Sequence, residues 1–98
     1  PPNYDKKVID SWKNALENLK NARPGWDIAQ KYPDFYTAKK SDLDEILRLI
    51  DLRIVRLQAV VTRMQANQWL TSTEEAWIKE DTSLANQLDS LAQKLNSN

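Results

Sequence analysis

The amino-acid sequence predicts an all-α protein folded as an antiparallel three-helix bundle, and three observations lead to this fold class. Apolar residues recur at alternating spacings of four and three from residue 43 to residue 64, and the alternation returns, with one acidic member, from residue 77 to residue 95. Only an α-helix brings residues with these spacings onto one face. The 98 residues also include one glycine and four prolines, too few turn-forming residues for a sheet protein of this length.

The first helix is expected over residues 5–22. The apolar residues of this segment that share one helical face are Val8, Ile9, Trp12, Ala15, Leu16, Leu19 and Ala22. Arg23-Pro24-Gly25 follows, where proline restricts the residue before it and glycine adopts positive φ freely. We therefore predict that the helix stops before these three residues.

Residues 23–40 form a connector that is long for a helical bundle, in which connections usually span about 2–8 residues. Its aromatic residues are Trp26, Tyr32, Phe35 and Tyr36. Pro33 followed by Asp34 suits the first turn of a helix, so there is room for a short fourth helix within residues 26–38. Two interpretations of the rings stay open: they cover the end of the bundle, or they form a surface that binds a peptide or another protein.

The second helix is expected over residues 41–67, with Ser41 as a suitable N-cap. The members of its heptad seam are Leu43, Leu47, Ile50, Ile54, Leu57, Val61 and Met64. Further apolar residues flank this seam at Ile46, Leu49, Leu52, Val55 and Val60. An apolar surface this wide is typical of a central helix that is buried against two neighbours.

The third helix is expected over residues 72–95. Its N-terminus carries two candidate capping boxes, Thr71 with Glu74 and Ser72 with Glu75, in which a hydroxyl and a carboxylate satisfy each other's backbone N–H groups. The turn before it is short, and a short turn makes two consecutive helices antiparallel neighbours.

Asp81 occupies a position in the seam of the third helix whose other members are apolar. We favour an aspartate that contacts water or pairs with a lysine of the first helix, because Asp81 lies near the start of its helix. The alternative is a buried group that fixes the register of the helices or binds a cation of a partner.

The charges balance, with fourteen basic and fourteen acidic residues, and this neutrality argues against nucleic acid as a partner. Residues 1–40 carry eight Lys and Arg against five Asp and Glu, whereas residues 68–98 carry two against five. We therefore expect the first and last helices to attract each other. The arginines of the second helix alternate with acids and are interpreted as a solvated face.

Catalytic and metal-binding chemistry finds little support in the sequence. There is no cysteine and no histidine, so disulfides, thiol nucleophiles and histidine acid–base catalysis are excluded. No Gly-rich phosphate loop is present. We expect a protein that is not an enzyme and that needs no cofactor or metal, and we keep as an alternative a helical bundle that binds or converts a small molecule in a pocket.

A resemblance to a known family is carried by residues of the second helix, namely Ile50-Asp51, Leu57, Val61, Met64 and Ala66-Asn67. These residues resemble the second helix in the N-terminal regulatory domains of Golgi and endosomal syntaxins. The layout of an aromatic-bearing first helix, a long linker and a helical hairpin is similar as well. The resemblance implies a three-helix bundle that docks membrane-trafficking factors on its surface.

The sequence predicts a single soluble domain over residues 1–98, without a membrane span, since no apolar run approaches the ~18 residues that a span needs. We expect a non-catalytic protein–protein interaction or assembly module. Its partner, a protein or peptide, would dock on the aromatic segment 26–36 or in a groove beside the second helix. The rival expectation is a homo-oligomer that forms through the wide apolar surface of that helix.

Overall fold

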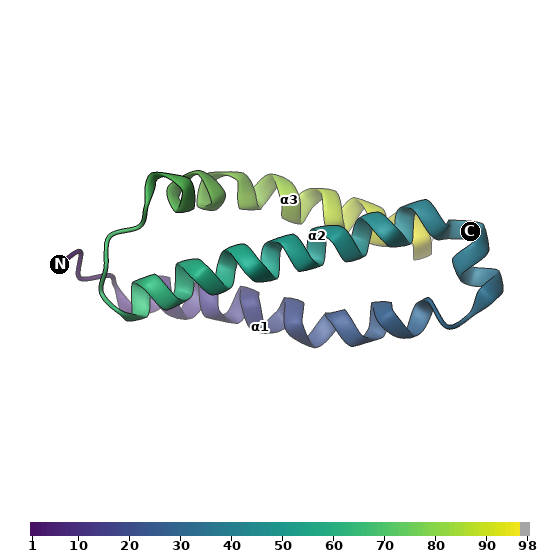
Figure 1. The fold of residues 1–98 in the computed structure, drawn as a ribbon, viewed down its shortest axis with the longest axis horizontal. Helices are drawn as coiled ribbons and strands as arrows, with labels where there is room; N and C mark the ends of the chain where they lie inside the picture. Colours follow the sequence, from purple (N-terminus) through teal and green to yellow (C-terminus); the bar gives the residue numbers. More distant parts are fainter. Residues whose placement is uncertain (97–98) are drawn as a thin grey trace.

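The computed structural model contains three long helices that run antiparallel to their neighbours (Figure 1). It describes residues 1–96, and for Pro33 and residues 35–37 it describes the backbone alone. The helices are α1 (Lys6–Ala29), α2 (Pro33–Gln65) and α3 (Ser72–Asn96). They form a rod with extents of 52 × 20 × 18 Å. The predicted all-α three-helix bundle is confirmed.

Helix α2 is the central helix of the bundle and lies between α1 and α3 (Figure 1). In the described part of the chain, the backbone of α2 lies close to that of α1 and to that of α3, whereas the backbones of α1 and α3 do not come close to each other. The largest fully buried side chains among the described residues all belong to α2, and they are Leu43, Ile46, Leu49, Ile50, Leu57 and Val60. The sequence therefore identified the central helix correctly.

The sequence analysis predicted that the first helix stops before Arg23, and this prediction is wrong. In the structure α1 passes through Pro24 and continues to Ala29. A proline inside a helix removes one backbone hydrogen bond and costs about 3 kcal/mol. Contacts on both sides of the proline offset this cost. Arg23 forms ion pairs with Asp27 in the next turn and with Asp51 of α2, and Trp26 packs against the hydrophobic core.

Helix α2 begins at Pro33, eight residues before the predicted start at Ser41. Pro33 occupies the first turn, as expected for a short helix in the connector, and a kink at Lys39 (φ −129°, ψ 26°) separates this short segment from the long one. Lys39 Nζ donates a hydrogen bond of 2.8 Å to the carbonyl oxygen of Leu95 at the end of α3. The link between α1 and α2 therefore shrinks to residues 30–32.

The turn between α2 and α3 satisfies the backbone groups at both helix ends. Asn67 takes the left-handed conformation (φ 55°), and its N–H and that of Gln68 donate to the carbonyls of Met64 and Arg63, which is the Schellman pattern. At the start of α3, the Thr71 N–H donates to Glu74 Oε1 (2.8 Å) and the Glu74 N–H donates to Thr71 Oγ1 (3.1 Å). The first of the two predicted capping boxes is thus confirmed.

A ladder of ion pairs connects α2 to α3. From the turn outward the pairs are Arg63–Glu74, Arg56–Glu80, Arg53–Asp81 and Asp42–Lys94. In each pair the two residue numbers have nearly the same sum, which is expected when two helices run antiparallel. The acids of α3 therefore pair with arginines of α2, and the expected attraction between the first and last helices is not what these contacts show. The interpretation of the arginines as a solvated face is also wrong for these three.

Asp81 is buried, which contradicts the favoured interpretation and supports the alternative of a buried group that fixes register. Its side chain accepts two hydrogen bonds from Arg53, of 2.9 Å from Nε and 3.0 Å from Nη2. Asp81 is 7% exposed and Arg53 is 9% exposed. The reason for the error is that an aspartate ten positions into a helix lies far enough from the end to be covered by a long arginine of the neighbouring helix.

We predict that Asp81→Ala lowers the free energy of unfolding by about 3–5 kcal/mol, because Arg53 then stays buried without a partner. Replacing both partners, Arg53→Met with Asp81→Leu, should recover most of the loss. The control is Glu80→Ala, whose carboxylate is 53% exposed and should cost less than about 1 kcal/mol. Urea denaturation measures all three. Equal, small effects for Asp81→Ala and Glu80→Ala would contradict a buried pair.

We predict that Gly25→Ala stabilises the protein by about 0.5–1 kcal/mol, because alanine has less freedom than glycine to lose when it joins a helix. Gly25 lies inside α1, and a Cβ added there meets no atom within 4 Å. Thermal or urea unfolding measures the change. If α1 ended before Gly25 with the glycine at positive φ, the same substitution would destabilise the protein.

Candidate functional site

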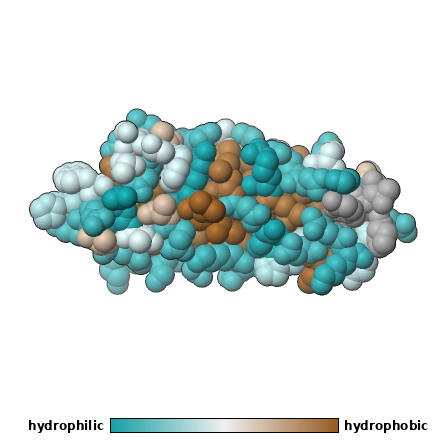
Figure 2. Space-filling view, in the orientation of Figure 1, coloured by the Kyte–Doolittle hydropathy of each residue, from teal (hydrophilic) through white to brown (hydrophobic). Residues whose placement is uncertain are grey.

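One face of α2 points away from both neighbouring helices and carries an apolar stripe. This outer stripe consists of Leu52, Val55, Ala59, Thr62 and Ala66. Their spacings of three and four place them on one side of the helix. Val55 is 65% exposed, Leu52 and Ala59 are half-buried, and Thr62 and Ala66 are exposed. Figure 2 shows apolar surface along the middle of the viewed face, where α2 lies in Figure 1.

A shallow groove of about 410 Å³ hollows the second half of the outer stripe. It is lined by Val55, Gln58, Ala59, Thr62, Arg63, Ala66, Gln68 and Glu74. The smallest side chains in this lining are those of Ala59 and Ala66, and Val55 stands at one end of the groove.

Arg63 and Glu74 form one wall of the groove. Arg63 Nε lies 2.6 Å from Glu74 Oε1, and Arg63 Nη1 donates to Gln68 Oε1 over 3.2 Å. Burial opposes ionisation of Glu74, but Arg63 and the N–H and hydroxyl of Thr71 together outweigh it and hold the pKa of Glu74 below its ordinary value. The wall therefore carries a fixed pair of opposite charges beside the apolar floor.

Gln58 forms the opposite edge of the groove and connects it to α1. Its Oε1 accepts a hydrogen bond of 3.0 Å from Lys20 Nζ, and its Nε2 donates to Thr62 Oγ1 over 3.1 Å. The first of these contacts joins α1 to the edge of the groove. The same edge is polar, whereas the floor between the two edges is apolar.

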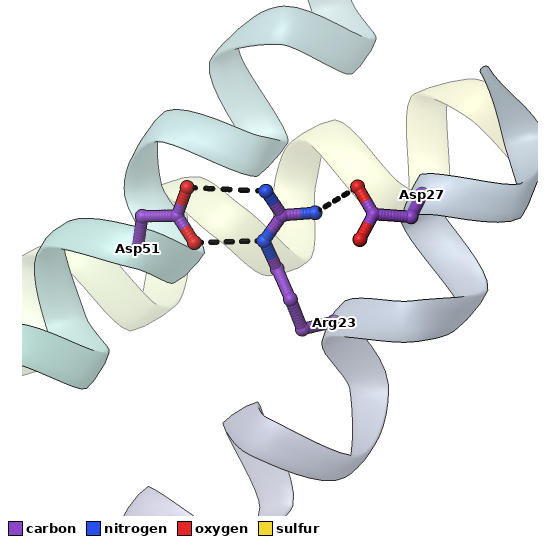
Figure 3. A network of polar contacts seen from close by, with 3 residues as sticks. All are labelled: Arg23, Asp27 and Asp51. Carbon is purple, nitrogen blue, oxygen red and sulfur yellow. Dashed lines mark hydrogen bonds and ion pairs between the residues drawn. The ribbon is translucent and has the colours of Figure 1, made fainter.

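Further along the same flank, Arg23 joins α1 to α2 (Figure 3). Its guanidinium lies between two carboxylates, donating to Asp51 from Nε (2.7 Å) and Nη2 (3.2 Å) and to Asp27 from Nη1. The hydrogen bonds to Asp51 are the main reason why the pKa of Arg23 is raised, burial opposes the rise, and Asp27 adds to it. Ion pairs thus connect α2 to its neighbours on both flanks, and no helix of the described residues covers its outer stripe.

The four aromatic residues that the sequence analysis selected have different surroundings. Trp26 is half-buried and packs against the hydrophobic core, as expected if the rings cover the end of the bundle. Tyr32 is 62% exposed. The side chains of Phe35 and Tyr36 lie outside the described residues. A binding surface that joins all four rings stays a prediction.

The sequence analysis placed Leu52 and Val55 among residues buried against a neighbour, but the structure leaves Val55 exposed. Both neighbours of α2 lie on its other sides. A signal was present in the sequence, because Leu52, Val55 and Ala59 continue to Thr62 and Ala66 as a second seam of alternating spacing. The two seams lie on different sides of one helix, and a single periodicity does not say which of them the chain itself covers.

Among the described residues, the polar groups beside the groove belong to the Arg63–Glu74 wall and to the Gln58 edge. The described residues hold no group of three or more side chains that could bind a metal ion. Within residues 1–96, no helix combines the length and apolar character needed to cross a bilayer. What the arrangement offers is contact area for an apolar surface with a polar rim.

Comparisons with protein-family models, with curated proteins and with solved structures find no match to this chain. The fold and the face described above therefore define only a class, that of a three-helix bundle whose central helix keeps one apolar side exposed.

We predict that the stability of the protein falls in acid partly because Glu74 becomes protonated. Since its folded pKa is lowered, the stability it contributes is complete above the ordinary carboxyl value of about 4.3 and is lost as the pH falls through the lower folded value. Glu74→Gln, which keeps the capping box, should cost about 1–2 kcal/mol at neutral pH.

The measurement is urea denaturation between neutral pH and about pH 3, across the range in which carboxylates titrate. The free energy of unfolding of Glu74→Gln should fall less steeply toward acid than that of the wild type. Glu75→Gln is the matched control, because Glu75 is exposed and outside the capping box. Parallel curves for Glu74→Gln and the wild type would contradict a role of ionised Glu74.

Proposed function

We propose that this protein is a non-catalytic protein-binding module that docks an amphipathic helix of a partner on the outer stripe of α2. The observation that carries the proposal is the exposed side chain of Val55, 65% accessible, beside a groove with a floor of small side chains. Exposed apolar surface on a folded domain weakens solubility unless something covers it. An apolar stripe with a polar rim is also the usual composition of a protein-binding face.

The mechanism is the packing of a helix into a groove. A partner helix with apolar residues at i, i+3, i+4 and i+7 presents a stripe that matches the spacing of Val55, Ala59 and Thr62. Small side chains at Ala59 and Ala66 allow the two helix axes to approach closely. The Arg63–Glu74 wall and the Gln58 edge offer polar groups to the flanks of the partner. A small apolar ligand would find an open groove and little enclosure, which favours a helix as the occupant.

The end of the bundle near the connector is the second candidate surface for the same function. Ile28 and Tyr32 are 49% and 62% exposed there, and an exposed tyrosine is a common anchor in protein interfaces. This surface is smaller in the described residues, because Trp26 packs inward against the core. The outer stripe is therefore the first choice and the connector the second. Docking of trafficking factors on such a bundle, as the likeness to syntaxin domains implies, would use either surface.

We predict that Val55→Glu abolishes or weakens partner binding at least about tenfold, since a charge in the interface loses the apolar contact and is desolvated. Val55 is exposed, so the fold should be preserved. Proteins captured from the source cell by the wild type are purified and titrated by calorimetry against each variant.

Val8→Glu is the matched control, because Val8 is also an exposed valine (43%) but lies on α1. It should bind like the wild type. Tyr32→Ser tests the connector: a loss of binding in this variant together with normal binding of Val55→Glu would move the docking surface to the end of the bundle. Normal binding of every captured protein to both variants would reject the proposed function for both surfaces.

A further inference from the structure

We infer that the helix that docks on the outer stripe is acidic, with Glu or Asp on both flanks of its apolar face, and that Arg63 and Lys20 bind these carboxylates. The inference rests on the proposed function, because it names the chemistry of the partner of the same surface. Two observations lead to it. The accessible charge of the Arg63–Glu74 wall is its cation, and a lysine stands beside the opposite edge of the groove.

The Arg63–Glu74 wall presents its guanidinium and hides its carboxylate. The side chain of Arg63 is 34% exposed, whereas that of Glu74 is 7% exposed. Among the described residues that line the groove, these two are the charged ones. The pair is neutral as a whole, but its negative end lies beneath the surface, so a partner in the groove meets the positive end first. Because Coulomb attraction falls with distance, the accessible side of the wall favours an anion.

Arg63 also keeps hydrogen-bond donors for a partner. Its Nε lies against Glu74 Oε1, and its Nη1 donates to Gln68 Oε1 in the same lining. A guanidinium has five N–H groups and no acceptor, so N–H groups remain after these two contacts. A carboxylate suits them best, since it can accept two parallel hydrogen bonds from one arginine. Glu74 and Gln68 already hold the guanidinium in place, which lowers the entropy lost on binding.

Lys20 supplies a second cation, at the Gln58 edge of the groove. Its Nζ donates a hydrogen bond of 3.0 Å to Gln58 Oε1, and Gln58 lines the groove. The side chain of Lys20 is 42% exposed, and the nearest oxygen of Glu17 lies 3.8 Å from its Nζ. An ion pair of this length at the surface is weak, so the ammonium is available to a partner. Each edge of the groove therefore has a cation, and the floor between them is apolar.

This pattern of charge fits an acidic amphipathic helix. When the apolar face of such a helix lies on the floor of the groove, the side chains on its flanks lie over the two edges, where Glu or Asp meets Arg63 and Lys20. A helix with Lys or Arg at the same positions would bring like charges together. Charges at the rim of an interface chiefly set the rate of association and the choice of partner. The cations therefore select the partner, while apolar contact with Val55 holds it.

The first experiment titrates the intact wild-type chain by calorimetry with three synthetic peptides of about 20 residues, long enough to form a helix. All three have leucine or alanine at i, i+3, i+4 and i+7, and their flanking positions carry glutamate, lysine or glutamine. At about 20 mM salt, where exposed charges are little screened, the glutamate peptide should bind at least about fivefold more tightly than the lysine peptide. The difference should shrink at about 0.5 M salt. Equal dissociation constants, or tighter binding of the lysine peptide, would overturn the inference.

Two variants test the two cations. Lys20→Gln should lower the preference for the glutamate peptide over the lysine peptide at least about twofold. Arg63→Gln is combined with Glu74→Gln, because the single change would leave a buried carboxylate without its counter-charge, and the double variant should lower the preference by at least the same factor. Lys79→Gln is the matched control, since Lys79 is exposed on α3 and lies two residues from the buried Asp81, on the other side of the helix. An unchanged preference in Lys20→Gln and in the double variant would overturn the inference.

These outcomes also separate the inference from the proposed function. Equal binding of the three peptides that Val55→Glu abolishes would overturn the acidic partner and keep the docking surface. Binding of none of the peptides would reject the outer stripe as a docking surface and the inference with it. Sedimentation equilibrium tests a second copy as the occupant: a wild-type mass above 11.4 kDa that Val55→Glu returns to this value would overturn the inference.

Discussion

The buried ion pair between Arg53 and Asp81 sets how α3 lies on α2. Moving two charges out of water is costly, and the attraction between them repays the cost only when the geometry is good. Here the carboxylate accepts two hydrogen bonds from one guanidinium, and both side chains are buried. Apolar heptads alone would tolerate a shift of α3 by one repeat. A shift by seven residues would leave Asp81 buried opposite Ile46 or Val60, without a charged partner, so the pair favours a single register.

That register has consequences for the rest of the molecule. Once Arg53 faces Asp81, the arginines at positions 56 and 63 fall opposite Glu80 and Glu74, and the short turn with its Schellman and capping-box bonds can close. Helix α3 is then held on one side of α2, while α1 is held on another by apolar packing and by the Arg23–Asp51 pair. A helix has room for more than two neighbours. The outer stripe is the part of α2 that this arrangement leaves open.

The parts of the fold that follow from local patterns could be predicted from the sequence. The seam of α2, the antiparallel third helix and the Thr71–Glu74 capping box depend on spacings within a few turns of helix. The extent of α1 could not, because Pro24 signals a stop locally and only the contacts of Arg23 and Trp26 with distant residues override it. The partner of Asp81 lies 28 residues away, so the burial of this acid could not be predicted from the residues near it in the sequence.

The sequence analysis expected a docking groove beside the second helix as one alternative, but it could not say which side of that helix stays uncovered. Periodicity shows that a side of α2 is apolar, but the number of neighbours that cover it depends on how all three helices assemble. With both neighbours of α2 on its other sides, the apolar width of α2 exceeds what α1 and α3 can cover, and the excess appears as the exposed Val55 and the groove beside it. In a protein without a partner the exposed Val55 would have no use, because a polar residue at this position would keep the fold and suit the contact with water better. The exposed stripe lies on the helix that packs against both of its neighbours, and a surface that is already ordered loses little conformational entropy if a partner binds.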